Sequence, residues 1–75
     1  PNPSTDLVTL LYPSTTDAQP QLTVFNHLGQ AILRKQLDHS GQLQLHVSRW
    51  AAGAYVVRVQ MGETVVVERL VVQKE

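Results

Sequence analysis

The sequence SRWAAGAYVVRV, Ser48 to Val59, places a glycine and a tyrosine two residues apart at the start of a valine-rich run. Within that run Tyr55 and Val57 fall on one side, and the residues between them fall on the other. A period of two residues is typical of a half-buried β-strand and not of a helix. We therefore predict a strand over 55–61 that the chain enters through a sharp turn at Gly53, since glycine tolerates backbone angles closed to other residues.

The same alternation recurs along the chain, and each apolar run ends at a turn signal rich in Gly, Pro, Asn, Asp or Ser. No segment has the 3.6-residue period of an amphipathic helix. The predicted strands cover residues 5–11, 22–25, 30–37, 42–47, 55–61 and 64–73. Asn26–Gly29 and Asp38–Gly41 are predicted to be hairpin turns, with positive φ at Gly29, and Gly62–Glu63 a two-residue turn. Segment 12–20 has room for a seventh, short strand.

These elements predict an all-β fold, an immunoglobulin-like antiparallel β-sandwich of six to seven strands. The 75 residues suffice for one domain. The residues predicted to form its continuous dry face are Leu43, Leu45, Val47, Tyr55, Val57 and Val59. We expect Trp50 to close one end of the sandwich and the hydroxyl of Tyr55 to find a hydrogen-bond partner at the rim.

Composition argues against several partners. Six basic and six acidic residues give a formal charge of zero, so neither nucleic acid nor an anionic membrane surface is an expected partner. There is no cysteine for a disulfide, no signal-peptide pattern and no apolar run near the about 18 residues of a membrane helix. Because the chain begins at Pro1, we expect it to be part of a longer precursor.

Catalytic and metal-binding patterns are weak. Asp38, His39 and Ser40 are adjacent, whereas a catalytic triad needs side chains that converge from separate parts of a fold. The three histidines include His27 and His46, and no spacing among them resembles a zinc site. We therefore expect no enzymatic activity, no metal and no cofactor.

Three further signals have ordinary explanations. The glycosylation-like segment Asn2–Ser4 is blocked by its central proline, and Arg34–Lys35 is too small a basic cluster to bind phosphates. Tyr12, Trp50 and Tyr55 could form a sugar-stacking platform, but aromatic residues this sparse are more typical of a core.

The C-terminal strand is apolar on both faces. Its two rows are Val65, Val67 and Val71 on one side and Val66, Leu70 and Val72 on the other. Such a strand either lies in the middle of a sheet with both faces covered, or leaves one row exposed as a docking surface. An exposed apolar strand also allows strand exchange between copies, and so a strand-exchanged homodimer of the isolated chain.

Four motifs occur in a familiar order. They are PNP at residues 1–3, LTVFNHLGQAI at 22–32, LQLHVSRWAAGAYVVRV at 43–59 and ERLVVQK at 68–74. In this order and spacing they resemble the C-terminal sorting domain of the type IX (Por) secretion system, type A, over essentially the whole chain. The sequence departs from the pattern at 26–28, where an Asp is usual, and at Glu68–Arg69, where lysine is frequent.

The resemblance implies a C-terminal signal on secreted enzymes and adhesins of certain Gram-negative bacteria. It implies that an N-terminal cargo reaches the periplasm, crosses the outer-membrane translocon with a shuttle protein, and is cut from the domain by a surface sortase. The cargo then stays at the outer membrane and cell surface or is secreted. The family-like positions are Asn2, Pro3, Gly29, Gly53, Tyr55, Leu70, Val71, Val72 and Lys74.

The alternative is an immunoglobulin-like accessory or carbohydrate-binding module of an extracellular enzyme. A sorting signal must end its precursor, so Glu75 should lie at or beside the last codon of the gene, whereas an accessory module has no such constraint. In either case we expect residues 1–75 to form a single domain without catalysis of its own.

Overall fold

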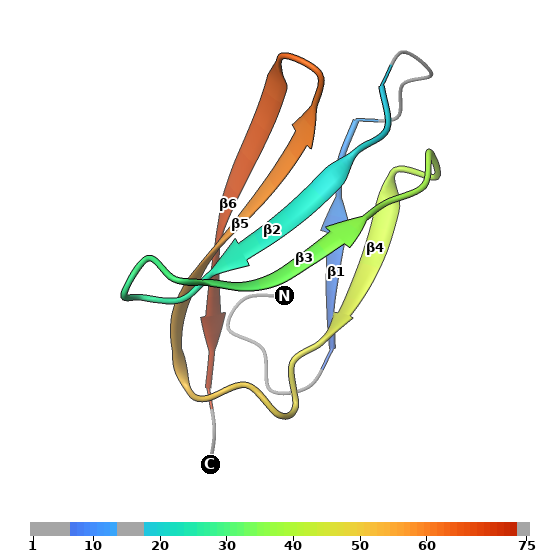
Figure 1. Ribbon diagram of the computed structural model, residues 1–75. Helices are drawn as coiled ribbons and strands as arrows, with labels where there is room; N and C mark the ends of the chain where they lie inside the picture. Colours follow the sequence, from blue (N-terminus) through green and yellow to red (C-terminus); the bar gives the residue numbers. More distant parts are fainter. Residues whose placement is uncertain (1–6, 14–17, 74–75) are drawn as a thin grey trace.

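The computed structural model describes residues 7–13 and 18–73 of the protein and contains six strands (Figure 1). The strands are β1 (Leu7–Leu11), β2 (Gln21–Phe25), β3 (Ala31–Gln36), β4 (Gln42–His46), β5 (Gly53–Met61) and β6 (Thr64–Val72). The described residues form no helix, and so none that could cross a membrane. Each strand lies within two residues of its predicted bounds wherever those bounds fall on described residues.

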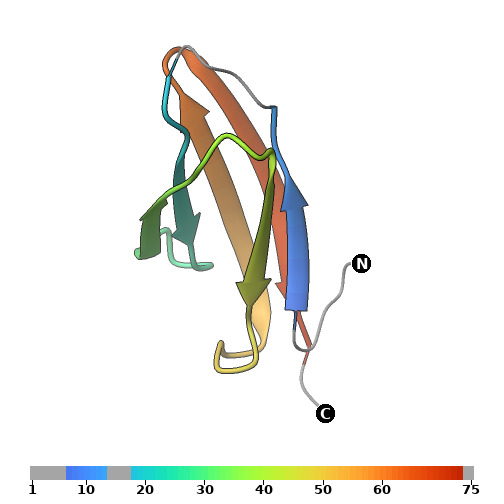
Figure 2. The same cartoon turned by 90° about the vertical axis from the view of Figure 1, so that its right-hand side faces the viewer.

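The strands form two antiparallel sheets. One has the order β3-β2-β5-β6, and the other pairs β1 with β4. Figure 2 shows the two sheets as two layers, with β1 and β4 in front of the larger sheet. The predicted all-β antiparallel sandwich is therefore confirmed, while its immunoglobulin-like topology stays a prediction.

A single core lies between the layers. Its buried apolar residues are Val8, Leu10, Tyr12, Leu22, Val24, Leu37, Leu45, Val47, Tyr55, Val57, Val59, Met61, Leu70 and Val72. The predicted burial is thus confirmed except at Leu43, which is only half-buried at the margin of the core. The predicted single continuous face is wrong, because β4 and β5 belong to different sheets and bury these residues from opposite layers. Leu43 lies on β4, which has a neighbour on one side only in its two-stranded sheet, so its other side stays partly open to solvent.

Two of the predicted turns form as expected. Asn26 to Gly29 joins β2 to β3: the N–H of Asn26 donates to the carbonyl of Gln30 at 2.9 Å, and Gly29 has a φ of 81°. Gly62–Glu63 joins β5 to β6, with a φ of 59° at Gly62. Glycine accepts these positive angles without the steric penalty of a side chain.

The predicted hairpin at Asp38–Gly41 is wrong. The N–H of Leu37 still donates to the carbonyl of Pro20, at 2.8 Å, in line with the β2–β3 pairing. The N–H of Tyr12 donates to the carbonyl of Gly41 at 2.9 Å, in line with the β1–β4 pairing. The chain therefore changes sheets here, because turn residues fix a reversal of direction but not the strand that pairs next.

The seventh strand proposed within 12–20 is not formed by the described part of that segment. Tyr12, Pro13 and residues 18–20 belong to no strand, and residues 14–17 lie outside the described residues.

Candidate functional site

β6, the strand that carries the closing motif, lies at an edge of the larger sheet and among the described strands pairs with β5 alone. Leu70 and Val72 point into the core and are 3% and 1% exposed. On the opposite face Val65 and Val67 are 49% and 59% exposed, whereas Val71 is half-buried. The central-strand interpretation is therefore wrong, and the exposed row is confirmed at Val65 and Val67.

The Gly-x-Tyr motif is paired directly with the end of β6. In the β5–β6 register Gly53 lies opposite Val72, and Tyr55 lies opposite Leu70. Ala54, between them, lies opposite Val71. Two motifs about fifteen residues apart in the sequence thus form one continuous piece of sheet, so the shape of the closing strand depends on how the chain enters β5.

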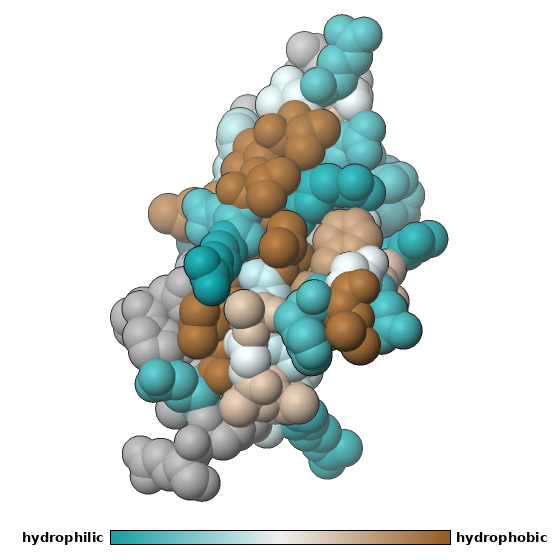
Figure 3. Space-filling view, turned by 90° about the vertical axis from the view of Figure 1, so that its left-hand side faces the viewer, coloured by the Kyte–Doolittle hydropathy of each residue, from teal (hydrophilic) through white to brown (hydrophobic). Residues whose placement is uncertain are grey.

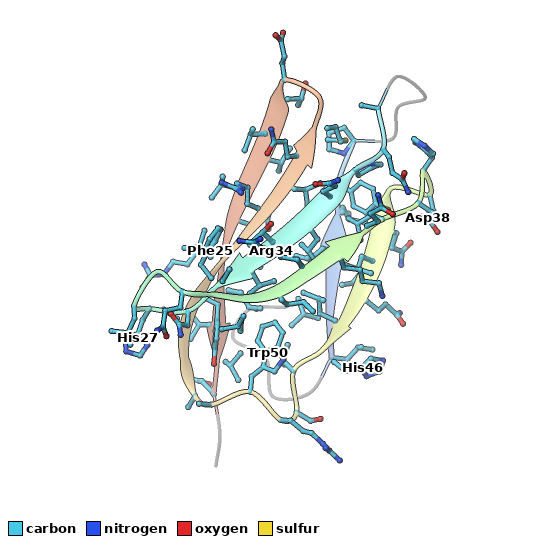
Figure 4. The ribbon with its side chains drawn as sticks, viewed as in Figure 1. Phe25, His27, Arg34, Asp38, His46 and Trp50 are labelled. Carbon is cyan, nitrogen blue, oxygen red and sulfur yellow. The ribbon has the colours of Figure 1, made fainter. Side chains whose placement is uncertain are left out.

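Tyr55 enters the core with its ring and bonds through its hydroxyl, as predicted. Its ring is buried, and its hydroxyl donates to the carbonyl of Ala51 at 2.6 Å. The ring centroid lies 5.0 Å from that of Trp50, and the two planes are inclined at 51°. Trp50 lies in the loop that joins β4 to β5, and Figure 4 shows its side chain at one end of the sandwich, as expected. The aromatic pair and the hydrogen bond hold this loop against the core.

Gly53 starts β5 with a φ of 152°. This region of backbone space is essentially reserved for glycine. A Cβ at this position would meet no atom within 4 Å, so the backbone angle and not the available space requires glycine.

The β2–β3 turn that contains Gly29 is held by the side chain of Asn26. Oδ1 of Asn26 accepts hydrogen bonds from the N–H groups of Leu28 and Gln30, both at 3.0 Å. Nδ2 of the same side chain donates to Oε1 of Gln30 at 3.0 Å. Asn26 therefore supplies the turn-forming carboxamide at a place where the family pattern usually has Asp, and the departure is structurally conservative.

A shallow depression of about 570 Å³ connects this turn with the end of the sheet. Its lining comes from the turn, β5 and β6, and includes Gly29, Tyr55, Val56, Val67 and Arg69. Gly29 is thus brought to the same region as Tyr55, although the two lie on different hairpins.

The outer face of the larger sheet carries residues that the sequence analysis did not select as a site. Across this face Arg34 lies opposite Thr23, Thr23 opposite Arg58, and Arg58 opposite Val67. The guanidinium carbon of Arg58 lies 5.2 Å from the ring centre of Phe25, within range of a cation–π contact. The alternation around Arg58 predicts that it points outward, but the alignment of residues from four strands appears only once the register is known.

The hydrogen bonds of Asp38 and Ser40 stabilise the crossover between the two sheets. Hydrogen bonds from Ser40 and from Tyr12 lower the pKa of the Asp38 carboxyl group. The hydroxyl of Tyr12 donates to the backbone oxygen of Asp38 at 2.9 Å and lies 3.2 Å from its Oδ1. Oγ of Ser40 donates to the carbonyl of Gln42 at 3.1 Å. These bonds fasten the crossover between the sheets.

The histidines lie on three different segments. His27 is in the β2–β3 turn, His39 in the β3–β4 crossover and His46 at the end of β4, and Figure 4 shows His27 and His46 well apart. Within residues 7–13 and 18–73 no three His, Cys, Asp or Glu side chains are grouped as metal ligands. The expected absence of enzymatic activity stays a prediction.

The aromatic residues do not form an exposed platform. Tyr12 and Tyr55 are each 7% exposed and belong to the core, and Trp50 packs against it. The sugar-stacking alternative therefore loses the flat, accessible surface that it requires, and the core interpretation is confirmed.

The structure brings together most of the family-like positions. Gly53, Tyr55, Leu70, Val71 and Val72 form the β5–β6 ladder, and Gly29 borders the adjoining depression. The remaining family-like positions, Asn2, Pro3 and Lys74, lie outside the described residues.

Comparison with known families agrees with this arrangement. A family described as the secretion system C-terminal sorting domain matches residues 1–73, nearly the whole chain. No curated protein matches the chain. A match of this extent includes both halves of the β5–β6 ladder and the β2–β3 turn, and the chain therefore belongs to the family of type IX secretion C-terminal sorting domains.

Proposed function

We propose that this domain directs an attached N-terminal cargo from the periplasm through the outer-membrane type IX translocon, and that a surface sortase then removes it. The family match over residues 1–73 carries this proposal, because a sorting domain acts on the protein to which it is joined. A shuttle protein and the translocon are its partners in transit. The cargo ends at the cell surface or in the medium.

The folded sandwich supports a role in which the secretion machinery recognises the domain by its surface. We propose that the machinery acts on the domain and that the domain itself catalyses nothing, because the side chains of Asp38 and Ser40 make local hydrogen bonds in the crossover between the sheets. The pairing of β6 with β5 holds the exposed side chains of Val65 and Val67 in fixed positions, and residues presented on a rigid sheet need little ordering when they bind.

The direct test is transfer of sorting. The 75-residue domain is fused to the C-terminus of a periplasmic reporter enzyme in a bacterium with a type IX system. We expect the reporter at the cell surface or in the medium, without the domain attached. A reporter that folds, is active and remains in the periplasm would contradict the proposal.

Truncation locates the signal. A fusion that lacks residues 71–75 should keep an active reporter but leave it in the periplasm. Since Val72 is only 1% exposed, this deletion also removes a core contact. The matched control is Val72→Ala, which weakens the core but retains the strand. Export of the Val72→Ala fusion together with retention of the truncated one assigns the signal to the strand, whereas normal export of the truncated fusion would favour an accessory module.

A further inference from the structure

The outer face of the larger sheet combines positive charge with exposed apolar side chains. Arg34 and Arg58 both lie opposite Thr23, one on each side. Neighbouring strands are about 4.8 Å apart, so the backbones of the two arginines are about 10 Å apart on one face. Val67 continues the same row on β6.

Exposed apolar side chains lie on the same face beside β6, next to Gln60 and Arg69. Val56, Val65 and Val67 are 41%, 49% and 59% exposed. Figure 3 shows brown, apolar side chains running along this side of the molecule with teal, hydrophilic ones on their flanks. Exposed valines on neighbouring strands form a patch of the kind that marks interaction sites.

Acidic groups are placed elsewhere in the described residues. Asp38 lies in the β3–β4 crossover and Glu63 in the β5–β6 turn. Glu68 belongs by register to the opposite row of β6, and its exposed side chain borders the depression. The chain has no net formal charge, yet its outer face is cationic and apolar.

This distribution selects among three occupants. A second copy stacked on the same face would bring arginines against arginines, and like charges at an interface disfavour association. An anionic bilayer is bound by a polar face rich in Lys and Arg around a large apolar stripe, whereas here short valines are interleaved with separated arginines, and of these arginines only Arg69 borders the shallow depression. A protein surface that interleaves carboxylates with apolar side chains matches both the charge and the shape of this outer face.

We propose that this outer face, defined by Phe25, Arg34, Val56, Arg58, Val65 and Val67, binds a protein of the secretion machinery through a surface of carboxylates and apolar side chains. The inference rests on the proposed sorting function. The valines supply apolar burial, and the arginines orient the partner, because guanidinium groups bind carboxylates in a fixed, two-pronged geometry. Phe25 holds Arg58 over its ring and so limits the conformations of that guanidinium before binding.

The test uses the reporter fusion with both arginines reversed in charge, Arg34→Glu with Arg58→Glu. The matched control is Arg49→Glu, because Arg49 is exposed in the β4–β5 loop and is not part of the outer face. We expect the double reversal to lower surface delivery at least tenfold and the control to change it less than twofold. Arg34→Lys with Arg58→Lys should lower it less than the double reversal does, because lysine keeps the positive charge but not the two-pronged geometry. Circular dichroism and urea unfolding of the isolated chains check that the variants remain folded.

The outcomes separate the two proposals. If the unsubstituted fusion is not exported, the proposed function fails. If it is exported and the folded double reversal is exported equally well, the function stands and the docking surface is wrong. If the double reversal unfolds, the folded single variants Arg34→Glu and Arg58→Glu decide, with a reduction of at least threefold expected for each and unchanged export overturning the proposal.

A photo-crosslinker at Val67 identifies the class of partner, with Gln44 on β4 as the control position. An adduct with a second protein that is absent from the charge-reversed variant supports the proposal. An adduct of two copies of this chain overturns it, and so does charge-dependent flotation of the isolated chain with phosphatidylglycerol vesicles.

Discussion

Removal of the Tyr55 hydroxyl tests how the Gly-x-Tyr motif acts. Tyr55→Phe keeps the buried ring and its contact with Trp50 but removes the donor that bonds the carbonyl of Ala51 at 2.6 Å. A hydrogen bond of this kind contributes about 0.5–1.5 kcal/mol. Ala51 is an exposed residue and the bond is only partly buried, so we expect a loss at the lower end of this range, about 0.5–1 kcal/mol.

Tyr55→Ala should cost much more, because it also removes the ring from the core. Replacing a buried aromatic side chain by alanine costs about 3–5 kcal/mol. A chain of 75 residues has a total stability of about 4–11 kcal/mol at about 0.05–0.15 kcal/mol per residue. Tyr55→Ala should therefore leave the domain marginally folded, whereas Tyr55→Phe should remain folded.

Urea unfolding followed by Trp50 fluorescence and far-ultraviolet circular dichroism measures both variants. With a slope of about 1 kcal/mol per molar urea, Tyr55→Phe should lower the midpoint by about 0.5–1 M. Tyr12→Phe is the matched control, since its hydroxyl donates to the backbone oxygen of Asp38 at 2.9 Å, away from Trp50. Equal losses for Tyr55→Phe and Tyr55→Ala would refute the conclusion that the ring contributes more than the hydroxyl, and no loss for Tyr55→Phe would remove the hydrogen bond as a stabilising contact.

Three further predictions concern other parts of the fold. Gly53→Ala should lower the unfolding free energy by about 1–3 kcal/mol, because a φ of 152° strains any other residue, whereas Ala52→Gly in the preceding loop should change it much less. Equal urea midpoints for Gly53→Ala and the parent would contradict this prediction. Hydrogen bonds lower the pKa of Asp38 below its ordinary 3.8, so its carboxylate contributes stability that is present above that pH and is lost as pH falls through the lowered pKa. On acidification, the urea midpoint of Asp38→Asn should therefore fall less than that of the parent. Parallel pH profiles of the two midpoints would be evidence against the contribution. Leu70→Ala should cost about 2–5 kcal/mol and Val65→Ala less than about 0.5 kcal/mol by thermal unfolding, because only Leu70 is buried; similar melting temperatures would mean that the two faces of β6 are misassigned.

The sequence predicts what depends on neighbouring residues along the chain. Alternation around Tyr55 and Val57 predicts the correct inward face, and glycine predicts the turns at Gly29 and Gly62. These features follow from strand geometry and backbone sterics, which act over a few residues. They can therefore be predicted without knowing which strands pair with one another.

Pairing between distant strands is not contained in those local signals. The reversal at Asp38–Gly41 is predicted, but the change of sheet is not, because it depends on which strand pairs with β4. The alignment of Arg34 with Arg58 likewise depends on two registers through Thr23, and the β2–β3 register shifts between Val24 and Phe25. A shift of one residue would place Arg34 on the other face.

The two faces of β6 separate folding from recognition within one strand. Leu70 and Val72 are nearly inaccessible, so a partner cannot contact them in the folded domain, and substitutions there act on sorting through stability. Val65 and Val67 are about half exposed, and surface substitutions outside special features change stability by about 0.5 kcal/mol or less. A sorting defect at Val67 in a domain of normal stability therefore reports on recognition, whereas a defect at Leu70 has to be compared with a core substitution of equal cost elsewhere, such as Leu22→Ala on β2. If Leu22→Ala and Leu70→Ala lower export equally, the inner row of β6 acts only through the fold, and the recognition surface is the outer face.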